Sequence, residues 1–204
     1  MTSMKMRAAV LSAYGSALQV GPILRPETAE GQVLVRVGAS GVNPLDLKIS
    51  KGQAPHARHS PPAILGIDVA GVVENVGAGV TSFKPGDEVY GMTGGVGGLQ
   101  GSLAEFVAAD VSLLAPKPKN IGTREAAALP LIFITAWEGL VDRAHVSGGQ
   151  KVLVHGGAGG VGHMAVQLAR ASDAAVFATG SLEDKAYIEH LGATFIDYKE
   201  TPVD

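Results

Sequence analysis

The sequence predicts a mixed α/β protein with two parts. An irregular β-rich domain covers residues 1–122, and the first βαβαβ half of a doubly wound, Rossmann-type parallel-sheet domain covers residues 123–204. Two patterns support this prediction: β-branched runs separated by glycine-rich turns fill the first part, and strand-like and helix-like segments alternate from Lys151 onward. The chain has 204 residues, 46% hydrophobic and 17% charged, enough for one large domain or two small ones.

In the β-rich part, two segments have the residue types of strands. Residues 32–42 (QVLVRVGASGV) and 68–80 (DVAGVVENVGAGV) are rich in valine and are interrupted by glycine. Pro85-Gly86-Asp87 predicts a tight turn, because proline presets φ and glycine accepts a positive φ. Residues 91–102 (GMTGGVGGLQGS) are expected to form a flexible loop inside this domain.

The pattern changes after residues 116–120 (PKPKN), and we place the domain boundary there. Thr123 is positioned to cap a helix over residues 124–129. Pro130 then interrupts an apolar run that continues toward Leu140. The predicted boundary therefore lies between residues 122 and 123.

Five segments alternate after this boundary: strands at 151–156, 174–180 and 194–198, with helices at 161–171 and 183–191. Such alternation predicts parallel strands joined by right-handed crossovers. A full doubly wound domain has two such halves, whereas this chain ends at Asp204, just after the third strand. We therefore expect either a truncated chain or a second half supplied by another polypeptide.

A glycine-rich segment lies at the first strand-to-helix turn. Gly157-Ala158-Gly159-Gly160-Val161-Gly162 fits the pattern G-x-G-x-x-G, in which the first glycine makes the tight turn, the second lets the backbone approach a pyrophosphate, and the third packs helix on strand. Backbone N–H groups and the positive end of the helix then face the anion. A purely structural turn is the alternative, but the preceding strand and the amphipathic helix that follows favour dinucleotide binding.

The end of the second strand indicates which nicotinamide cofactor binds. An Asp or Glu there would hold the ribose 2′-hydroxyl of NAD, whereas this chain has Thr179, Gly180 and Ser181. The missing carboxylate removes a source of repulsion against a 2′-phosphate, Ser181 is able to donate to it, and Lys185 is near enough in sequence to neutralise it. NADP(H) is therefore predicted, although Ser181 would also suit a helix N-cap and Lys185 a solvated helix position.

Charge and composition argue against several classes of protein. A net charge of −3 without a long basic run argues against nucleic-acid partners and anionic membrane surfaces, and the longest apolar stretch, residues 126–137, is too short to span a bilayer. The lack of cysteine excludes disulfides, thiolate catalysis and Cys-ligated zinc, and it fits a cytoplasmic protein. His56 and His59 have metal-like spacing but no third ligand nearby, so no metal site is predicted.

Five motifs together resemble the medium-chain dehydrogenase/reductase superfamily. They are GVNPLDLK (41–48), PPAILGIDVAGVVENVGAGVTSFKPGDEVYG (61–91), GSLAEFV (101–107), LPLIFITAWEGL (129–140) and VLVHGGAGGVG (152–162). Their order and spacing match the family over nearly the whole chain, and within it the chain resembles the zinc-free NADPH:quinone oxidoreductases of the zeta-crystallin-like branch. The resemblance implies that the β-rich domain is GroES-like and that the full-length protein is a homodimer.

The resemblance also implies a reaction without zinc. Zinc alcohol dehydrogenases have a cysteine and a histidine where this chain has Asn43 and Ile67, and they carry a four-cysteine structural lobe that this sequence lacks. Without a Lewis acid to polarise an alcohol, the family reaction that remains is hydride transfer from NADPH to a small-molecule acceptor that is already electron-poor, a quinone or an α,β-unsaturated carbonyl.

By similarity, the resemblance assigns site residues in both parts. Asn43 and Thr135 would lie near the nicotinamide as catalytic residues, with Asp46 and Lys48 around the substrate. The glycine turn would be joined in cofactor binding by Gly180, Ser181, Lys185 and Tyr198. Structural roles remain open for the catalytic pair, because Asn43 precedes a proline and suits a turn, and the Thr135 hydroxyl would bond equally well to a helix carbonyl.

Two other functions stay open. A non-catalytic NADP-binding or structural protein would fit half of a cofactor domain, and a zinc-type alcohol dehydrogenase is a more distant alternative. Turnover of NADPH would distinguish the first of these from a reductase. Stoichiometric zinc would identify the second.

Overall fold

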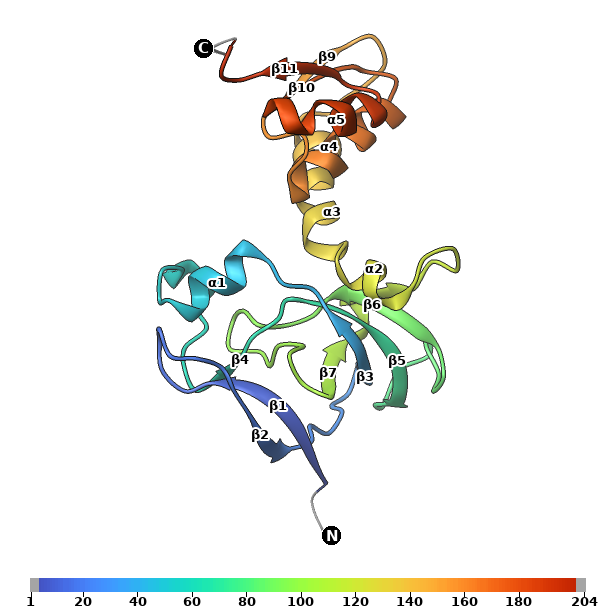
Figure 1. The fold of residues 1–204 in the computed structure, drawn as a ribbon. Helices are drawn as coiled ribbons and strands as arrows, with labels where there is room; N and C mark the ends of the chain where they lie inside the picture. Colours follow the sequence, from blue (N-terminus) through green and yellow to red (C-terminus); the bar gives the residue numbers. More distant parts are fainter. Residues whose placement is uncertain (1–3, 201–204) are drawn as a thin grey trace. The chain divides into compact units, whose positions relative to one another are not determined.

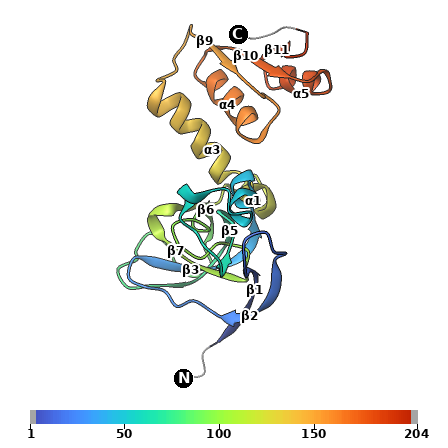
Figure 2. The same ribbon diagram turned by 90° about the vertical axis from the view of Figure 1, so that its left-hand side faces the viewer.

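A computed structural model describes residues 4–200 of the chain. Contacts between residues divide it into two compact units, Met1–Leu131 and Ile132–Asp204. Within residues 4–200 no helix has the length and apolar character that a membrane crossing requires. Figures 1 and 2 show the two units from two directions.

The first unit contains two antiparallel sheets (Figure 1). One has three strands in the order β2-β1-β4, and the other has five strands in the order β7-β3-β5-β6-β8. The strands are β1 (Lys5–Leu11), β2 (Gln19–Leu24), β3 (Gln32–Ser40), β4 (Ala63–Ile64), β5 (Asp68–Val76), β6 (Glu88–Met92), β7 (Phe106–Asp110) and β8 (Leu114–Pro116). The two predicted strand segments are therefore confirmed as β3 and β5, which pair with each other.

Alternate valines of the five-stranded sheet build the core of this unit. Val33 and Val35 of β3, and Val69 and Val73 of β5, are almost completely buried and cluster with valines of β6 and β7. Residues two apart on a strand point to the same face, so this spacing presents one continuous apolar surface. β-branched side chains also suit a pleated strand, which explains why these segments form the sheet.

Short helices connect and flank the strands of the first unit. They are α1 (Pro44–Ser50), the 3₁₀ turns η1 (Pro55–Ala57) and η2 (Val111–Leu113), and α2 (Thr123–Ala127). The N-cap of α2 is Gly122, so the prediction that Thr123 caps this helix is wrong by one residue. The end of the 91–102 loop is held by backbone hydrogen bonds, because Gly101 donates to Ile64 and Ser102 to Gly66, at 2.9 Å each.

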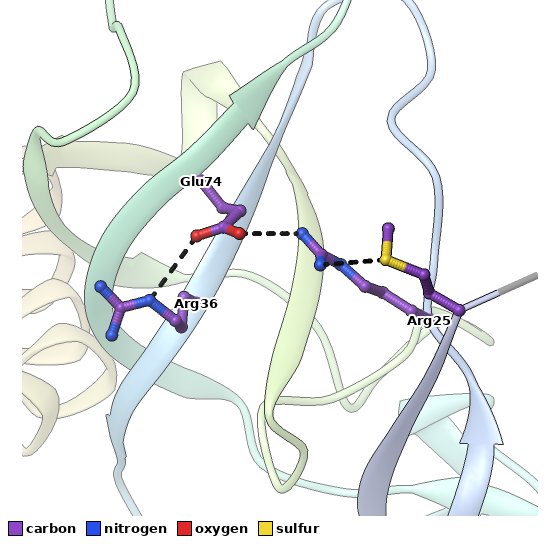
Figure 3. Close-up of polar contacts among 4 residues, drawn as sticks. Arg25, Arg36 and Glu74 are labelled. Atoms are coloured by element: carbon purple, nitrogen blue, oxygen red, sulfur yellow. Dashed lines mark hydrogen bonds and ion pairs between the residues drawn. The ribbon is translucent and has the colours of Figure 1, made fainter.

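A charged cluster connects the two sheets of the first unit (Figure 3). Glu74 on β5 forms ion pairs with Arg25 at 3.3 Å and with Arg36 at 3.6 Å. The Arg25 guanidinium also lies 3.9 Å from the ring centroid of Phe106 on β7. Since Arg25 directly follows β2, it joins the end of the three-stranded sheet to two strands of the five-stranded sheet. Partly exposed pairs of this kind contribute about 1 kcal/mol or less each.

The second unit is a parallel three-stranded sheet with helical crossovers (Figure 2). The strands lie in the order β11-β10-β9, and both pairings are parallel, which confirms the predicted βαβαβ arrangement. Its elements are α3 (Pro130–Trp137, which begins in the first unit), the π-helical turn η3 (Glu138–Arg143), β9 (Lys151–Val154), α4 (Gly160–Ala171), β10 (Ala175–Gly180), η4 (Leu182–Asp184), α5 (Lys185–His190) and β11 (Thr194–Asp197).

The core of the second unit lies where α4 and α5 pack on the sheet. Val166 and Ala169 of α4 are completely buried together with Ala178 of β10 and Ile188 of α5. Val166 and Ala169 are three residues apart and therefore share one face of the helix. The predicted helix over 183–191 is divided, because a 3₁₀ turn, η4, precedes α5.

Candidate cofactor and active sites

The glycine turn connects β9 to α4 at the carboxyl end of the parallel sheet. The residue with a left-handed backbone is Gly156, at φ +68°, and it lies one position before the first glycine of the G-x-G-x-x-G pattern. Gly157 itself lies within the tight turn, which the Gly159 N–H closes by donating to the Gly156 carbonyl oxygen at 2.9 Å. Gly159 is the N-cap of α4, in an extended conformation.

Gly157 and Gly162 are glycines because of close packing. A Cβ on Gly157 would lie 2.6 Å from the Cβ of Ala178 on β10, and a Cβ on Gly162 would collide with the carbonyl oxygen of Gly156. The turn is thus pressed against both the sheet and its own helix. Only a residue without a side chain permits this approach at either position.

The exposed side of the turn is formed by Gly159, Gly160 and Val161, with Ala158 partly buried beside them. The first-turn N–H groups of an α-helix have no partner within the helix, and the helix dipole places partial positive charge at the same end. α4 is 12 residues long and has no acidic residue in its first turn. Its amino end is therefore chemically suited to an anion such as a pyrophosphate.

Thr179, at the end of β10, ties the glycine turn to the sheet. Gly157 N–H donates to the Thr179 carbonyl oxygen at 2.8 Å, and Gly156 N–H donates to its hydroxyl oxygen at 3.0 Å. Tyr198, which follows β11 and is exposed, donates its N–H to the Gly180 carbonyl oxygen at 3.4 Å. The structure therefore brings the ends of all three strands to one edge, where the predicted cofactor residues of the turn, β10 and β11 meet.

Gly180 and Ser181 lie at the same edge and have clear structural roles. A Cβ on Gly180 would lie 2.6 Å from Cδ1 of Ile188, so helix α5 crosses too closely for a side chain. Ser181 is the N-cap of η4, and its hydroxyl and N–H both donate to the carboxylate of Asp184, at 2.7 and 3.1 Å. The Ser181 hydroxyl accordingly lowers the pKa of the Asp184 carboxyl below its usual value.

Lys185, the first residue of α5, is exposed, and its ammonium group lies 4.0 Å from a carboxylate oxygen of Glu189. The predicted partners of a 2′-phosphate, Ser181 and Lys185, are therefore close in the chain and both near carboxylates. Asp184, which was not among the predicted residues, lies at this edge through its hydrogen bonds with Ser181. The pattern S-x-x-D, the signature of a capping box, was the available signal.

In the first unit, three buried polar side chains surround the start of β5. Asn43, the N-cap of α1, is 5% exposed, Asp46 is 4% exposed and Asp68 has no exposed surface. The Asn43 side-chain amide donates from Nδ2 to Asp68 Oδ2 at 2.9 Å. Asp68 Oδ1 accepts the backbone N–H of Leu131, in the first turn of α3, at 2.9 Å.

Asp68 carries the largest electrostatic perturbation of this cluster. Burial raises the pKa of its carboxyl from 3.8 to about 6, and the nearby charge of Asp46 adds to the rise, while the hydrogen bonds from Asn43 and Leu131 oppose it. Asp68 was not among the site residues predicted from the sequence. Its signal is a single carboxylate inside the apolar run of residues 63–73, since a buried acid requires partners.

The predicted substrate residues Asp46 and Lys48 lie in different environments. Both oxygens of Asp46 accept backbone N–H groups, one from Asn43 at 2.8 Å and one from Gly66 at 3.1 Å, and burial raises the pKa of its carboxyl. Lys48 lies on the exposed side of α1. Thr135 is exposed on α3, in the second unit.

Metal-binding groups do not gather in the part of the chain that the structure describes. No cluster of three or more His, Cys, Asp or Glu side chains that could hold a metal ion occurs within residues 4–200. His59 is buried, and its Nε2 lies 3.2 Å from the Ile64 carbonyl oxygen.

Comparison with known proteins identifies relatives of the whole chain. Residues 29–119 match the family model of the alcohol dehydrogenase GroES-like domain. The chain is 43% identical over 210 residues to an NADPH-dependent alkenal/one oxidoreductase, chloroplastic, from Arabidopsis thaliana, and the match covers 98% of this chain and 54% of that protein. The chain thus spans about half the length of this relative.

Solved structures also match the chain over nearly its whole length. The fold matches an alcohol dehydrogenase superfamily protein from Novosphingobium aromaticivorans with a TM-score of 0.94 and 56% identity, covering 95% of this chain and 59% of that one. It also matches the quinone oxidoreductase from Coxiella burnetii with a TM-score of 0.89 and 33% identity, covering 98% of this chain and 64% of that one.

Proposed function

Because this chain belongs to the medium-chain dehydrogenase/reductase superfamily, we propose that the protein is an NADPH-dependent reductase that transfers a hydride to an α,β-unsaturated carbonyl or a quinone. The observation that carries the proposal is the glycine turn between β9 and α4, where the backbone is open to an anion and the packed glycines leave no room for side chains. The names of the Arabidopsis and Coxiella relatives support the substrate classes.

The residues of the second unit fit a dinucleotide. The N–H groups of Gly160 and Val161, with Gly159 before them, would hold the pyrophosphate, and Tyr198 and Gly180 would border the adenosine side of the site. When bound, NADPH supplies a hydride. The acceptor takes that hydride and one proton from water, so that a carbon–carbon double bond is saturated or a quinone becomes a quinol.

We further propose that NADPH is preferred over NADH. The end of β10 carries Thr179, Gly180 and Ser181 in place of an acid that would hold the ribose 2′-hydroxyl. Lys185 would balance the 2′-phosphate charge, with Ser181 as a hydrogen-bond donor. The name of the Arabidopsis relative, an NADPH-dependent enzyme, supports this preference.

The reaction is proposed to need no zinc. By the family resemblance, Asn43 and Ile67 stand where zinc alcohol dehydrogenases have cysteine and histidine ligands, and an isoleucine side chain offers no ligand atom. The amide nitrogen of Asn43 is bound to Asp68. We propose that Asn43 and Thr135 act beside the nicotinamide as catalytic residues and that Lys48 contacts the substrate, with Asp46 holding the start of α1 from within the fold.

The setting of the protein is also a proposal. A net charge of −3 and the lack of cysteine support a cytoplasmic protein without nucleic-acid or membrane partners. The family resemblance supports a homodimer of the full-length protein. Sedimentation velocity on that protein tests the dimer directly, since a monomer at micromolar concentration would contradict it.

Turnover tests the proposed function. The intact protein is mixed with NADPH and a panel of alkenals, alkenones and quinones, and NADPH oxidation is followed by absorbance, with NADH as the paired cofactor. We expect faster turnover with NADPH, and we expect the Gly159→Val variant to be inactive but folded. Tight NADPH binding without turnover of any acceptor would instead support the alternative, a non-catalytic NADP-binding protein.

A further inference from the structure

Asp68 lies between two segments that are far apart in the sequence. Its carboxylate is completely buried at the start of β5. One oxygen accepts from the Asn43 side chain at the N-terminus of α1, and the other accepts from the Leu131 N–H in the first turn of α3. These contacts connect residues 25 and 63 positions away in the chain, so one buried group fixes both helix starts.

The chemistry of these contacts fixes the orientation of the Asn43 amide. An ionised carboxylate only accepts hydrogen bonds, so the NH₂ group of Asn43, and not its oxygen, must face Asp68. The Asn43 oxygen is then directed toward the N-terminus of α1, where Asn43 and Asp46 form a capping box. Rotating the amide by half a turn would place donors against donors at the α1 end, so both ends of the side chain favour the same orientation.

We propose that Asp68 is a positioning residue of the reductase site, which as a carboxylate holds Asn43 in a single amide orientation and holds the first turn of α3 with its other oxygen. The inference rests on the proposed function, which places Asn43 beside the nicotinamide. Asp68 itself is completely buried and acts through its hydrogen bond with Asn43.

Replacing Asp68 by asparagine tests this role because the two side chains have nearly the same shape. The side-chain amide of the Asp68→Asn variant would have one acceptor oxygen, and the backbone N–H of Leu131 requires it. The NH₂ group introduced by the substitution would then face the NH₂ group of Asn43, so that two donors meet and Asn43 must rotate or lose its hydrogen bond. Protonated Asp68 has the same pattern of one acceptor and one donor, so low pH should produce the same change in the wild-type protein.

The experiment is a nuclear magnetic resonance titration of the intact protein labelled with ¹⁵N-asparagine. The Asn43 side-chain amide is assigned by its disappearance in an Asn43→Ala sample. In the wild type, the Asn43 amide signals should shift with a midpoint near the pKa of Asp68, about 6. In Asp68→Asn they should hold the low-pH position at every pH. Asp46 is the other titratable group in contact with Asn43, and a midpoint that survives in Asp68→Asn would belong to it.

Kinetics supply the second readout. Asp68→Asn should lower kcat with an enone or quinone by about tenfold or more, as expected when a positioned group is misplaced, while the NADPH dissociation constant stays unchanged. Asp110→Asn is the matched control, because Asp110 is an exposed carboxylate at the end of β7 that caps η2, a task that asparagine performs equally well. In the Asp110→Asn variant, the Asn43 amide signals should titrate as in the wild type, and kcat should be unchanged.

The outcomes separate this inference from the proposed function. Asn43 signals that titrate identically in the wild type and in Asp68→Asn, or an unchanged kcat in that variant, would overturn the positioning role. If Asp68→Asn does not fold, the wild-type titration decides, because Asn43 signals that stay fixed across the pKa of Asp68 overturn it. If the wild type fails to oxidise NADPH with every acceptor tested, the proposed function fails. A pH-dependent shift of the Asn43 signals that is lost in Asp68→Asn would still support Asp68 as the group that orients Asn43.

Discussion

The buried carboxyl of Asp68 should make the stability of the protein depend on pH in a specific direction. Its pKa is about 6 in the folded protein, against 3.8 for an unperturbed aspartate. The folded state therefore holds the proton more tightly than the unfolded chain does. Between pH 3.8 and about 6 the unfolded chain ionises while folded Asp68 stays protonated, so the free energy of unfolding falls as the pH rises through this window.

The size of the effect follows from the shift. A difference of about two pKa units corresponds to about 3 kcal/mol, all of which is lost once the pH exceeds the folded pKa. The Asp46 carboxyl, whose pKa burial also raises, contributes with the same sign. Asp68→Asn removes only the Asp68 share, so the stability difference between wild type and variant should itself change by about 3 kcal/mol across the window.

Denaturant unfolding at a series of pH values, followed by far-ultraviolet circular dichroism, measures this difference. Asp110→Asn is again the control, since hydrogen bonds from Ser112 lower the pKa of the Asp110 carboxyl and place its titration below the window. The reasoning is refuted if the curves of the wild type and Asp68→Asn run parallel between pH 3.8 and 7, because Asp68 would then titrate alike in the folded and unfolded states.

Four further predictions concern the cofactor site. Gly162→Ala should destabilise the second unit by about 1–3 kcal/mol in thermal unfolding, because the new Cβ collides with the Gly156 carbonyl oxygen. Gly159→Val should abolish NADPH binding in calorimetry without unfolding the protein, since its Cβ has only one near neighbour, at 3.2 Å; unchanged affinity would contradict the pyrophosphate assignment. Ser181→Asp should shift preference toward NADH through repulsion of the 2′-phosphate, and equal preference would show that another residue selects the cofactor. Asp184→Asn should strengthen NADPH binding more than NADH binding, and a matched gain for NADH would show that the Asp184 charge does not act on the 2′-phosphate.

The sequence was sufficient where local rules decide the structure. The strand at residues 68–76 follows from a valine pattern, and the parallel unit follows from alternating segments around a glycine turn. Both predictions depend on the periodicity of apolar residues or on residues that are close together in the sequence. The predicted boundary at residue 122 stays a prediction, although the contacts of the structure divide the chain after Leu131.

A sequence pattern does not show which physical requirement makes each neighbouring residue a glycine. The motif assigns the tight turn to its first glycine, and Gly157 does lie in the turn that the Gly159 N–H closes onto the Gly156 carbonyl oxygen. The positive φ, however, belongs to Gly156, outside the motif, and Gly157 must also be a glycine because Ala178 of β10 is too close for a side chain. Only the position of the neighbouring strand shows this second requirement.

Asp68 shows the same limit for chemistry. In the sequence, Asp68 is a single acid next to Ile67, and the comparison with zinc alcohol dehydrogenases concerned only Asn43 and Ile67. The structure shows that the Asn43 side chain donates a hydrogen bond to Asp68. The buried carboxylate of Asp68 accepts hydrogen bonds from two helix starts and holds the Asn43 side chain in place, and its burial raises its pKa. Asn43 and Asp68 should therefore be treated as one unit, and substituting either should disturb the other.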